Sequence, residues 1–97
     1  MDLSIVIVNH NTKKLTEQTI QSVFDTTKNI SYEVIVADNS TDPSQVLDMK
    51  DDRVKILKNL ENKGFGNACN IGTKVAIGKY ILSVSYTHLT LPTTPYV

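Results

Sequence analysis

The amino-acid sequence predicts an α/β fold with three layers, in which helices cover a mostly parallel sheet of about four strands. Segments with the pattern of strands alternate along the chain with segments that have the pattern of helices. Two strand segments, residues 3–8 and 33–37, are almost continuously apolar and β-branched, as is typical of strands buried on both faces. This alternating order indicates parallel βαβ units with right-handed crossovers.

The strand at residues 3–8 runs into polar residues, of which Asn11 or Thr12 can cap a helix because a short side-chain oxygen accepts a free backbone N–H. One face of this helix is expected to pack inward, and its members are Leu15, Thr19, Ile20, Val23 and Phe24. After a loop and the strand at residues 33–37, Asp42-Pro43 is a typical helix start.

The helix that begins at Asp42-Pro43 is expected to be short and to continue through Val46, Leu47 and Met49. Residues 53–58 alternate between apolar and basic side chains and form the third predicted strand. A polar loop leads to a predicted helix at residues 67–77, which Gly78 ends. Its inward residues are expected to be Ala68, Ile71, Val75 and Ala76. The fourth strand begins at Tyr80.

The composition limits the classes of function. The chain has 97 residues, which allows one small domain at most. Ten basic side chains balance ten acidic ones, so charge gives no argument for nucleic acid or an anionic membrane as partner. The single cysteine, Cys69, excludes an internal disulfide bond and lacks the partners of a zinc site. No segment approaches the roughly 20 apolar residues of a membrane span, and we expect a cytoplasmic location.

The last part of the chain has a different character. Residues 85–97 are rich in Thr, Pro and Tyr and contain no acidic residue; the last side-chain carboxylate of the chain is that of Glu61. Pro92 and Pro95 argue against a central strand. We expect residues 1–84 to be a partial domain and residues 85–97 to be a non-native tail without a partner strand. The alternative is a natural C-terminus that pairs as one more strand.

Three polar segments follow or precede the predicted elements at one edge of the sheet, where open α/β sheets bind ligands. They are Asn9-His10-Asn11, Asp38-Asn39-Ser40 and residues 62–67. A carboxylate such as Asp38 can accept a hydrogen bond from a ribose hydroxyl or a pyrimidine N–H, and His10 can lie flat against a base. The third segment contains glycines that allow close approach of backbone to an anionic ligand. Together they favour a nucleoside diphosphate, although each alone is also compatible with ordinary turn chemistry.

Better-known phosphate motifs are absent. Cys69 stands where the dinucleotide fingerprint needs its third glycine. Thr73 and Tyr80 stand where a P-loop needs its first glycine and its Ser or Thr. These replacements exclude a Rossmann dehydrogenase and a P-loop NTPase.

The segments at residues 4–11, 34–42, 59–72 and 76–82, in this order, resemble the N-terminal half of a family 2 glycosyltransferase, which has the nucleotide-diphospho-sugar transferase fold. The resemblance covers residues 3 to about 82. It implies transfer of a sugar from a UDP- or dTDP-sugar donor to a saccharide or lipid-linked acceptor, as in cell envelope polysaccharide biosynthesis. Asp38-Asn39 and the Gly-Phe-Gly-Asn run at residues 64–67 are similar to the rhamnosyltransferase-like branch.

The resemblance also implies roles for individual residues. Val8 and His10 would line the base pocket, Asp38 would bind the pyrimidine or the ribose, and a segment from Gly64 to Asn70 would close over the nucleotide. The residues expected to bind nucleotide are therefore Val8, His10, Asp38, Asn39, Gly64, Gly66 and Asn70.

The chain departs from the family after its fourth strand. There the family has an Asp-x-Asp motif that holds Mg²⁺ or Mn²⁺ on the donor diphosphate, whereas this chain has Ser83-Val84-Ser85. Hydroxyl groups do not replace carboxylates for such hard cations. We therefore expect no metal ligand and no catalytic residue in this chain, a metal in the full-length parent, and an inactive fragment. The alternative is a non-enzymatic, flavodoxin-like binding or regulatory module.

Overall fold

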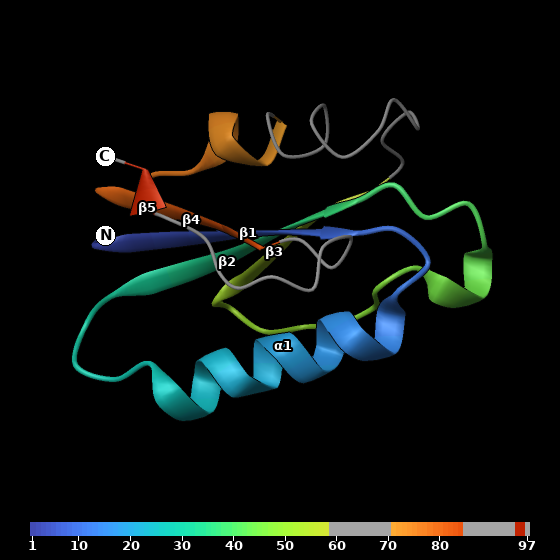
Figure 1. Cartoon of the computed structure of the whole chain (residues 1–97), viewed down its shortest axis with the longest axis horizontal. Coiled ribbons are helices and arrows are strands. Elements are labelled where there is room, and N and C mark those ends of the chain that lie inside the picture. Colours follow the sequence, from blue (N-terminus) through green and yellow to red (C-terminus); the bar gives the residue numbers. More distant parts are fainter. Residues whose placement is uncertain (59–70, 85–94, 97) are drawn as a thin grey trace.

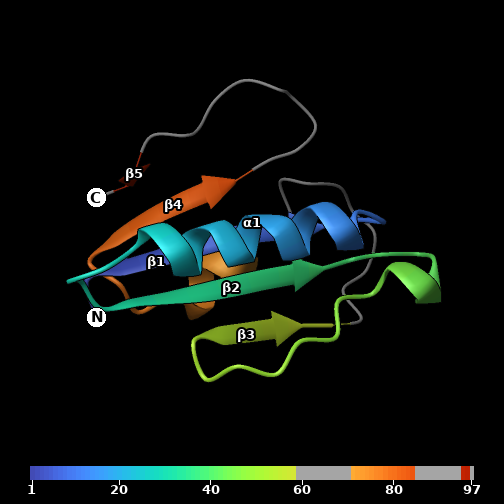
Figure 2. The ribbon, with the colours of Figure 1, turned by 90° about the horizontal axis from the view of Figure 1, so that it is seen from below.

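A computed structural model describes residues 1–58, 71–84 and 95–96 of the chain. A five-stranded sheet lies at the centre of the described part. Its strands are β1 (Leu3–Asn9), β2 (Tyr32–Asp38), β3 (Val54–Leu57), β4 (Tyr80–Val84) and β5 (Pro95–Tyr96). They lie in the order β3-β2-β1-β4-β5 (Figure 2); β1 to β4 are parallel to one another, and β5 is antiparallel to β4. The predicted α/β fold with a mostly parallel sheet is confirmed.

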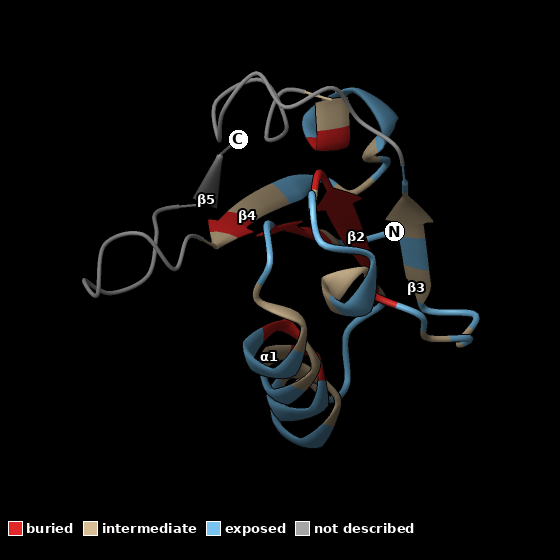
Figure 3. Ribbon diagram, turned by 90° about the vertical axis from the view of Figure 1, so that its right-hand side faces the viewer, coloured by how far each residue is buried: buried red, intermediate tan, exposed pale blue. Residues whose placement is uncertain are grey.

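Helices lie on both faces of the sheet. The helix α1 (Lys13–Thr26) covers one face, and a helical turn at residues 71–75 lies on the other, which gives the three predicted layers (Figure 1). Residues 4–9 of β1 and 33–38 of β2 are buried, in agreement with their continuous apolar pattern (Figure 3).

The core between α1 and the sheet contains alternate residues of the two central strands. Its buried members are Ile5, Ile7, Ile20, Val34, Val36 and Leu47. On the opposite face, a Cβ added to Gly72 would lie 2.6 Å from Val6 Cγ1, so the helical turn packs directly on the sheet. The apolar side chains of β1 and β2 are thus packed on both faces of the sheet.

The inward face of α1 differs in one position from the prediction. Ile20 is buried, and Val23 and Phe24 pack against the core, but Leu15 is 43% exposed. Thr16 is buried instead. Thr16 faces inward because its hydroxyl donates a hydrogen bond to the Asn9 side chain at the end of β1.

The helix predicted after β2 is shorter than expected. Asp42 caps it through a hydrogen bond from Ser44 N to its carboxylate, but only a 3₁₀-helix, η1 (Pro43–Gln45), forms. The expectation that it continues through Val46, Leu47 and Met49 was wrong. Leu47 N donates to Asp38 Oδ2 at 2.7 Å while the Leu47 side chain joins the core, and these contacts hold the chain out of a helix.

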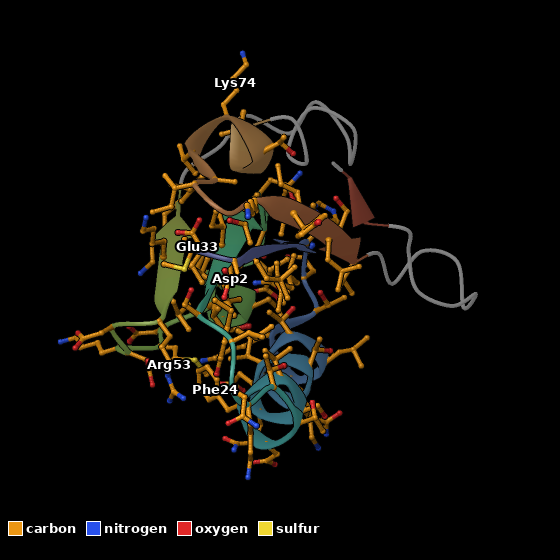
Figure 4. All side chains as sticks on the ribbon, turned by 90° about the vertical axis from the view of Figure 1, so that its left-hand side faces the viewer. Asp2, Phe24, Glu33, Arg53 and Lys74 are labelled. Atoms are coloured by element: carbon orange, nitrogen blue, oxygen red, sulfur yellow. The ribbon has the colours of Figure 1, made fainter. Side chains whose placement is uncertain are left out.

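The start of β3 is attached to α1 by Arg53. Its guanidinium lies 3.7 Å from the centre of the Phe24 ring and forms an ion pair with Asp51 (Figure 4). The hydrogen bonds from Arg53 hold the pKa of the Asp51 carboxyl at about 2. Arg53 is exposed, whereas Asp51 and Phe24 are half-buried, so these contacts hold the start of β3 against α1.

A buried carboxylate lies near the amino ends of the strands, which the sequence did not predict. Glu33 Oε2 accepts from the Ser4 hydroxyl at 2.6 Å and from Ile77 N at 2.8 Å, and Oε1 lies 2.9 Å from Lys55 Nζ. Burial disfavours the charge of Glu33. The hydrogen bonds from Ile77 N–H and the Ser4 hydroxyl, together with the Lys55 ammonium, outweigh burial and hold the pKa of this carboxyl below its ordinary value.

Gly78 lies against Ser4 of β1, whose hydroxyl donates to the buried Glu33 carboxylate. The Gly78 N–H donates to Ser4 Oγ at 2.8 Å, and an added Cβ would lie 2.6 Å from Ser4 N and Oγ. The sequence explained Gly78 as the end of a helix; its close contact with β1 is the stronger requirement.

Part of the expected tail does pair with the sheet. Pro95 and Tyr96 form β5 antiparallel to β4, opposite Leu82 and Ile81. The expectation that residues 85–97 have no partner strand was therefore wrong for these two residues. Among the described residues, no helix is long and apolar enough to cross a membrane.

Candidate functional site

The carboxyl ends of β1 and β2 lie side by side. Asn9 is aligned with Asp38 in the parallel register of the two strands. The loops that follow, residues 9–12 and 38–45, therefore meet at one edge of the sheet, as expected from the sequence. The third polar segment, residues 62–67 with Gly64 and Gly66, lies outside the residues that the structure describes, and so does Asn70.

Asn9 is completely buried and connects three elements. Its Nδ2 donates to Asp38 Oδ2 and to Gln45 O, each at 2.9 Å. Its Oδ1 accepts from Thr12 N, from the Thr12 hydroxyl and from the Thr16 hydroxyl at 3.0–3.2 Å. Every polar atom of the amide is used, so Asn9 fixes the end of β1 against both the second loop and α1.

This arrangement replaces the predicted helix cap. Thr12 occupies the N-cap position but makes no side-chain cap hydrogen bond. Gln45 Oε1 accepts from Lys13 N at 3.1 Å, and Asn9 accepts from Thr12 N. The expectation that Asn11 or Thr12 caps the helix was wrong, because groups from β1 and from the second loop satisfy its first N–H groups.

Asp38 is the second buried member of the site. It is 2% exposed; Oδ2 accepts from Asn9 Nδ2 and Leu47 N, and Oδ1 accepts from Ser40 N at 3.0 Å. A carboxylate offers about four lone-pair positions, and three are filled. The sequence resemblance implied that Asp38 binds the pyrimidine or the ribose; the structure places its carboxylate beneath the loops.

Asn11 connects the tips of the two loops. Its Oδ1 accepts from Thr41 N at 3.2 Å and from Asp42 N at 3.0 Å, and its backbone N–H donates to Ser40 Oγ at 3.0 Å. The backbone of Asn11 has a positive φ of 57°, a conformation that Asn tolerates better than most residues. Asn9 and Asn11 are not among the residues that the sequence predicted to bind nucleotide, although both belong to the polar segment Asn9-His10-Asn11.

Asn39 and His10 lie on top of this network. Asn39 N donates to Asn9 O at 3.0 Å, and the Asn39 side chain is buried. His10 is exposed, and its Nδ1 lies 3.1 Å from Asn39 O and 3.2 Å from Asn39 Oδ1. Val8, which was expected to line the base pocket, is 7% exposed and lies within the sheet.

The end of β4 lies at the same edge, since Val84 is aligned with Ile7 of β1. Its last residues are Ser83 and Val84, whose hydroxyl and isopropyl groups do not fit a divalent cation. In the part of the chain that the structure describes, no group of three His, Cys, Asp or Glu side chains could hold a metal ion. The end of β4 therefore does not fit the Mg²⁺ or Mn²⁺ that the sequence resemblance implies for the parent protein.

Comparisons with known proteins agree with this architecture. An uncharacterized glycosyltransferase of Haemophilus influenzae is 29% identical over 82 residues, which cover 80% of this chain and 25% of that protein. The crystal structure of S. aureus TarS superposes with a TM-score of 0.64 at 22% identity, over 87% of this chain and 27% of that one. The chain thus spans about a quarter of the relatives it matches. The sequence model of glycosyl transferase family 2 matches residues 4–84, nearly all of the sheet and its loops, and the chain belongs to that family.

Proposed function

We propose that this chain is the nucleotide-binding half of a glycosyltransferase domain and that its paired loops bind the nucleoside of a UDP- or dTDP-sugar. The observation that carries the proposal is the network around Asn9 and Asp38, which joins the ends of two adjacent parallel strands. This is the edge at which open α/β sheets bind nucleotides. A rigid pair of loops lowers the cost of ordering the site when a ligand binds.

The individual roles follow from position. His10 lies exposed at the surface of the loops, whereas Val8, Asp38 and Asn39 form the buried support beneath it. Gly64, Gly66 and Asn70 are proposed to close over the nucleotide.

The finer assignments are also proposals. We also propose a saccharide or lipid-linked acceptor, the rhamnosyltransferase-like branch and cell envelope polysaccharide biosynthesis, which the sequence resemblance implies. The cytoplasmic location is a separate proposal that rests on the apolar pattern of the sequence. The chain is proposed to be inactive by itself, because Ser83 and Val84 end β4 without a carboxylate pair. Membership of the glycosyltransferase family sets aside the alternative of a flavodoxin-like module.

An NMR titration of the full chain with UDP and dTDP tests the proposal. We expect shifts at residues 8–11, 38–40 and 64–70, dissociation constants in the millimolar range (about −4 kcal/mol), and no dependence on Mn²⁺. Gln18→Ala on the outer side of α1 is the control and should bind equally. Shifts confined to other parts of the chain, or a strong response to Mn²⁺, would contradict the proposal.

A further inference from the structure

The tautomer of His10 is set by its neighbour. Nδ1 of His10 lies 3.1 Å from the backbone carbonyl oxygen of Asn39. A carbonyl oxygen only accepts hydrogen bonds, so the hydrogen of the neutral imidazole is on Nδ1 and the free lone pair is on Nε2. The position of that carbonyl is itself fixed, because Asn39 is buried and its N–H donates to Asn9 O.

Asp38 is poorly placed to accept from a ligand. Its carboxylate is 2% exposed and already accepts from Asn9, Ser40 and Leu47. By contrast, His10 is exposed, and none of the described residues makes a hydrogen bond to its Nε2. Of these two side chains, the imidazole of His10 is therefore the more accessible acceptor.

We propose that His10 Nε2 accepts a hydrogen bond from the N3–H group of a uracil or thymine base, and that His10 thereby selects bases that carry this imide hydrogen. The inference rests on the proposed function, since it concerns the same nucleotide. It assigns the polar recognition of the base to His10 and leaves Asp38 to hold the loops beneath it. It also gives His10 a role different from stacking, which any aromatic ring would serve.

The affinities of two ligands for three proteins distinguish a hydrogen bond from His10 Nε2 from simple stacking of the His10 ring. UDP and N3-methyl-UDP are titrated against the wild-type chain, His10→Gln and His10→Phe in one mildly alkaline buffer. A neutral hydrogen bond corresponds to about a fivefold preference of the wild type for UDP. His10→Gln keeps an acceptor and should retain part of the preference. His10→Phe keeps a stacking ring without an acceptor and should bind both ligands equally.

The ratio of the two affinities within each protein is the measured quantity, so a general loss of affinity in a variant does not affect the comparison. An undiminished preference in His10→Phe would show that the methyl group collides elsewhere and would overturn the inference, as would equal binding of both ligands by the wild type. In both cases UDP still binds, and the proposed function stands. Gln18→Ala is again the matched control and should keep the wild-type ratio.

Two further measurements complete the test. A ¹⁵N spectrum of the free chain should show the proton of the neutral His10 ring on Nδ1; a proton on Nε2 would overturn the inference without any ligand. Titration with 2′-deoxy-UDP should match UDP, whereas a large loss confined to proteins with an acceptor at position 10 would place the hydrogen bond on the ribose and contradict the proposal. Absence of any nucleotide binding would overturn the proposed function and this inference with it.

Discussion

Asn9 and Asp38 lie opposite each other at the ends of the two central strands, and the Asn9 amide donates to the Asp38 carboxylate over 2.9 Å. Both side chains are buried. A buried carboxylate is costly unless it is hydrogen-bonded, and the amide of Asn9 supplies one of its three hydrogen bonds. The pair therefore contributes both to the stability of the fold and to the shape of the loops above it.

Asn9→Ala should destabilise the chain by about 2–4 kcal/mol, because it removes the buried amide and leaves the Asp38 carboxylate short of a donor. Chemical denaturation measures the change. Gln18→Ala, on the exposed side of α1, should stay within about 0.5 kcal/mol of the wild type. A loss below about 1 kcal/mol for Asn9→Ala would mean that water replaces the amide.

Asp38→Ala should also lower the free energy of unfolding by about 2–4 kcal/mol, since Asn9 Nδ2, Leu47 N and Ser40 N would lose their acceptor. Asp38→Asn retains one acceptor oxygen and should lose less. Equal stability of Asp38→Ala and the wild type would restore the view that this carboxylate faces a ligand.

Glu33 should make stability depend on pH in the acid range. Its pKa in the folded chain lies below the ordinary value of 4.5, so its contribution is fully present above that pH and is lost as the pH falls through the folded pKa. Asp42 and Asp51 also have lowered pKa values, so the wild type must be compared with Glu33→Gln. The difference in free energy of unfolding between the two should shrink below pH 4.5. A constant difference would contradict the assignment.

Deletion of residues 85–97 should lower the midpoint of thermal unfolding only slightly. The described part of this segment pairs through just two residues, Pro95 and Tyr96, with β4. A short edge strand adds little to the stability of a sheet that already has four parallel strands. A large fall in the midpoint would show that the segment is an integral strand, and its interpretation as non-native sequence would then be wrong.

The sequence was most informative where one physical effect dominates. The continuous β-branched runs in residues 3–8 and 33–37 predicted the two central strands, because only burial on both faces explains such a pattern. It was least informative where polar groups from distant segments compete. Apolar periodicity favoured Leu15 on the buried face of α1, but the hydrogen bond from the Thr16 hydroxyl to Asn9 Oδ1 places Thr16 there.

The sequence was equally uninformative about the hydrogen-bond partners of Asp38 and of the buried Glu33. Asp38 follows a strand, and that position alone does not show whether its carboxylate is exposed or is held by Asn9 and Leu47. Glu33 begins an apolar strand, and its partners Ser4 and Ile77 come from segments on either side of it in the sequence. Apolar periodicity along the chain does not show which polar residues of distant segments form hydrogen bonds in the fold.

The sheet order has a consequence for the sequence of folding events. Asn9 and Asp38 are 29 residues apart, whereas Ser4 and Gly78 are separated by 74. Closing the longer loop costs more conformational entropy, and contacts of long range form slowly. We therefore expect β1, α1 and β2 to condense first, with the two loops already joined, and β4 to dock later through Gly78 and Glu33. The part of the chain that would hold the nucleoside is then the folding nucleus of the fragment.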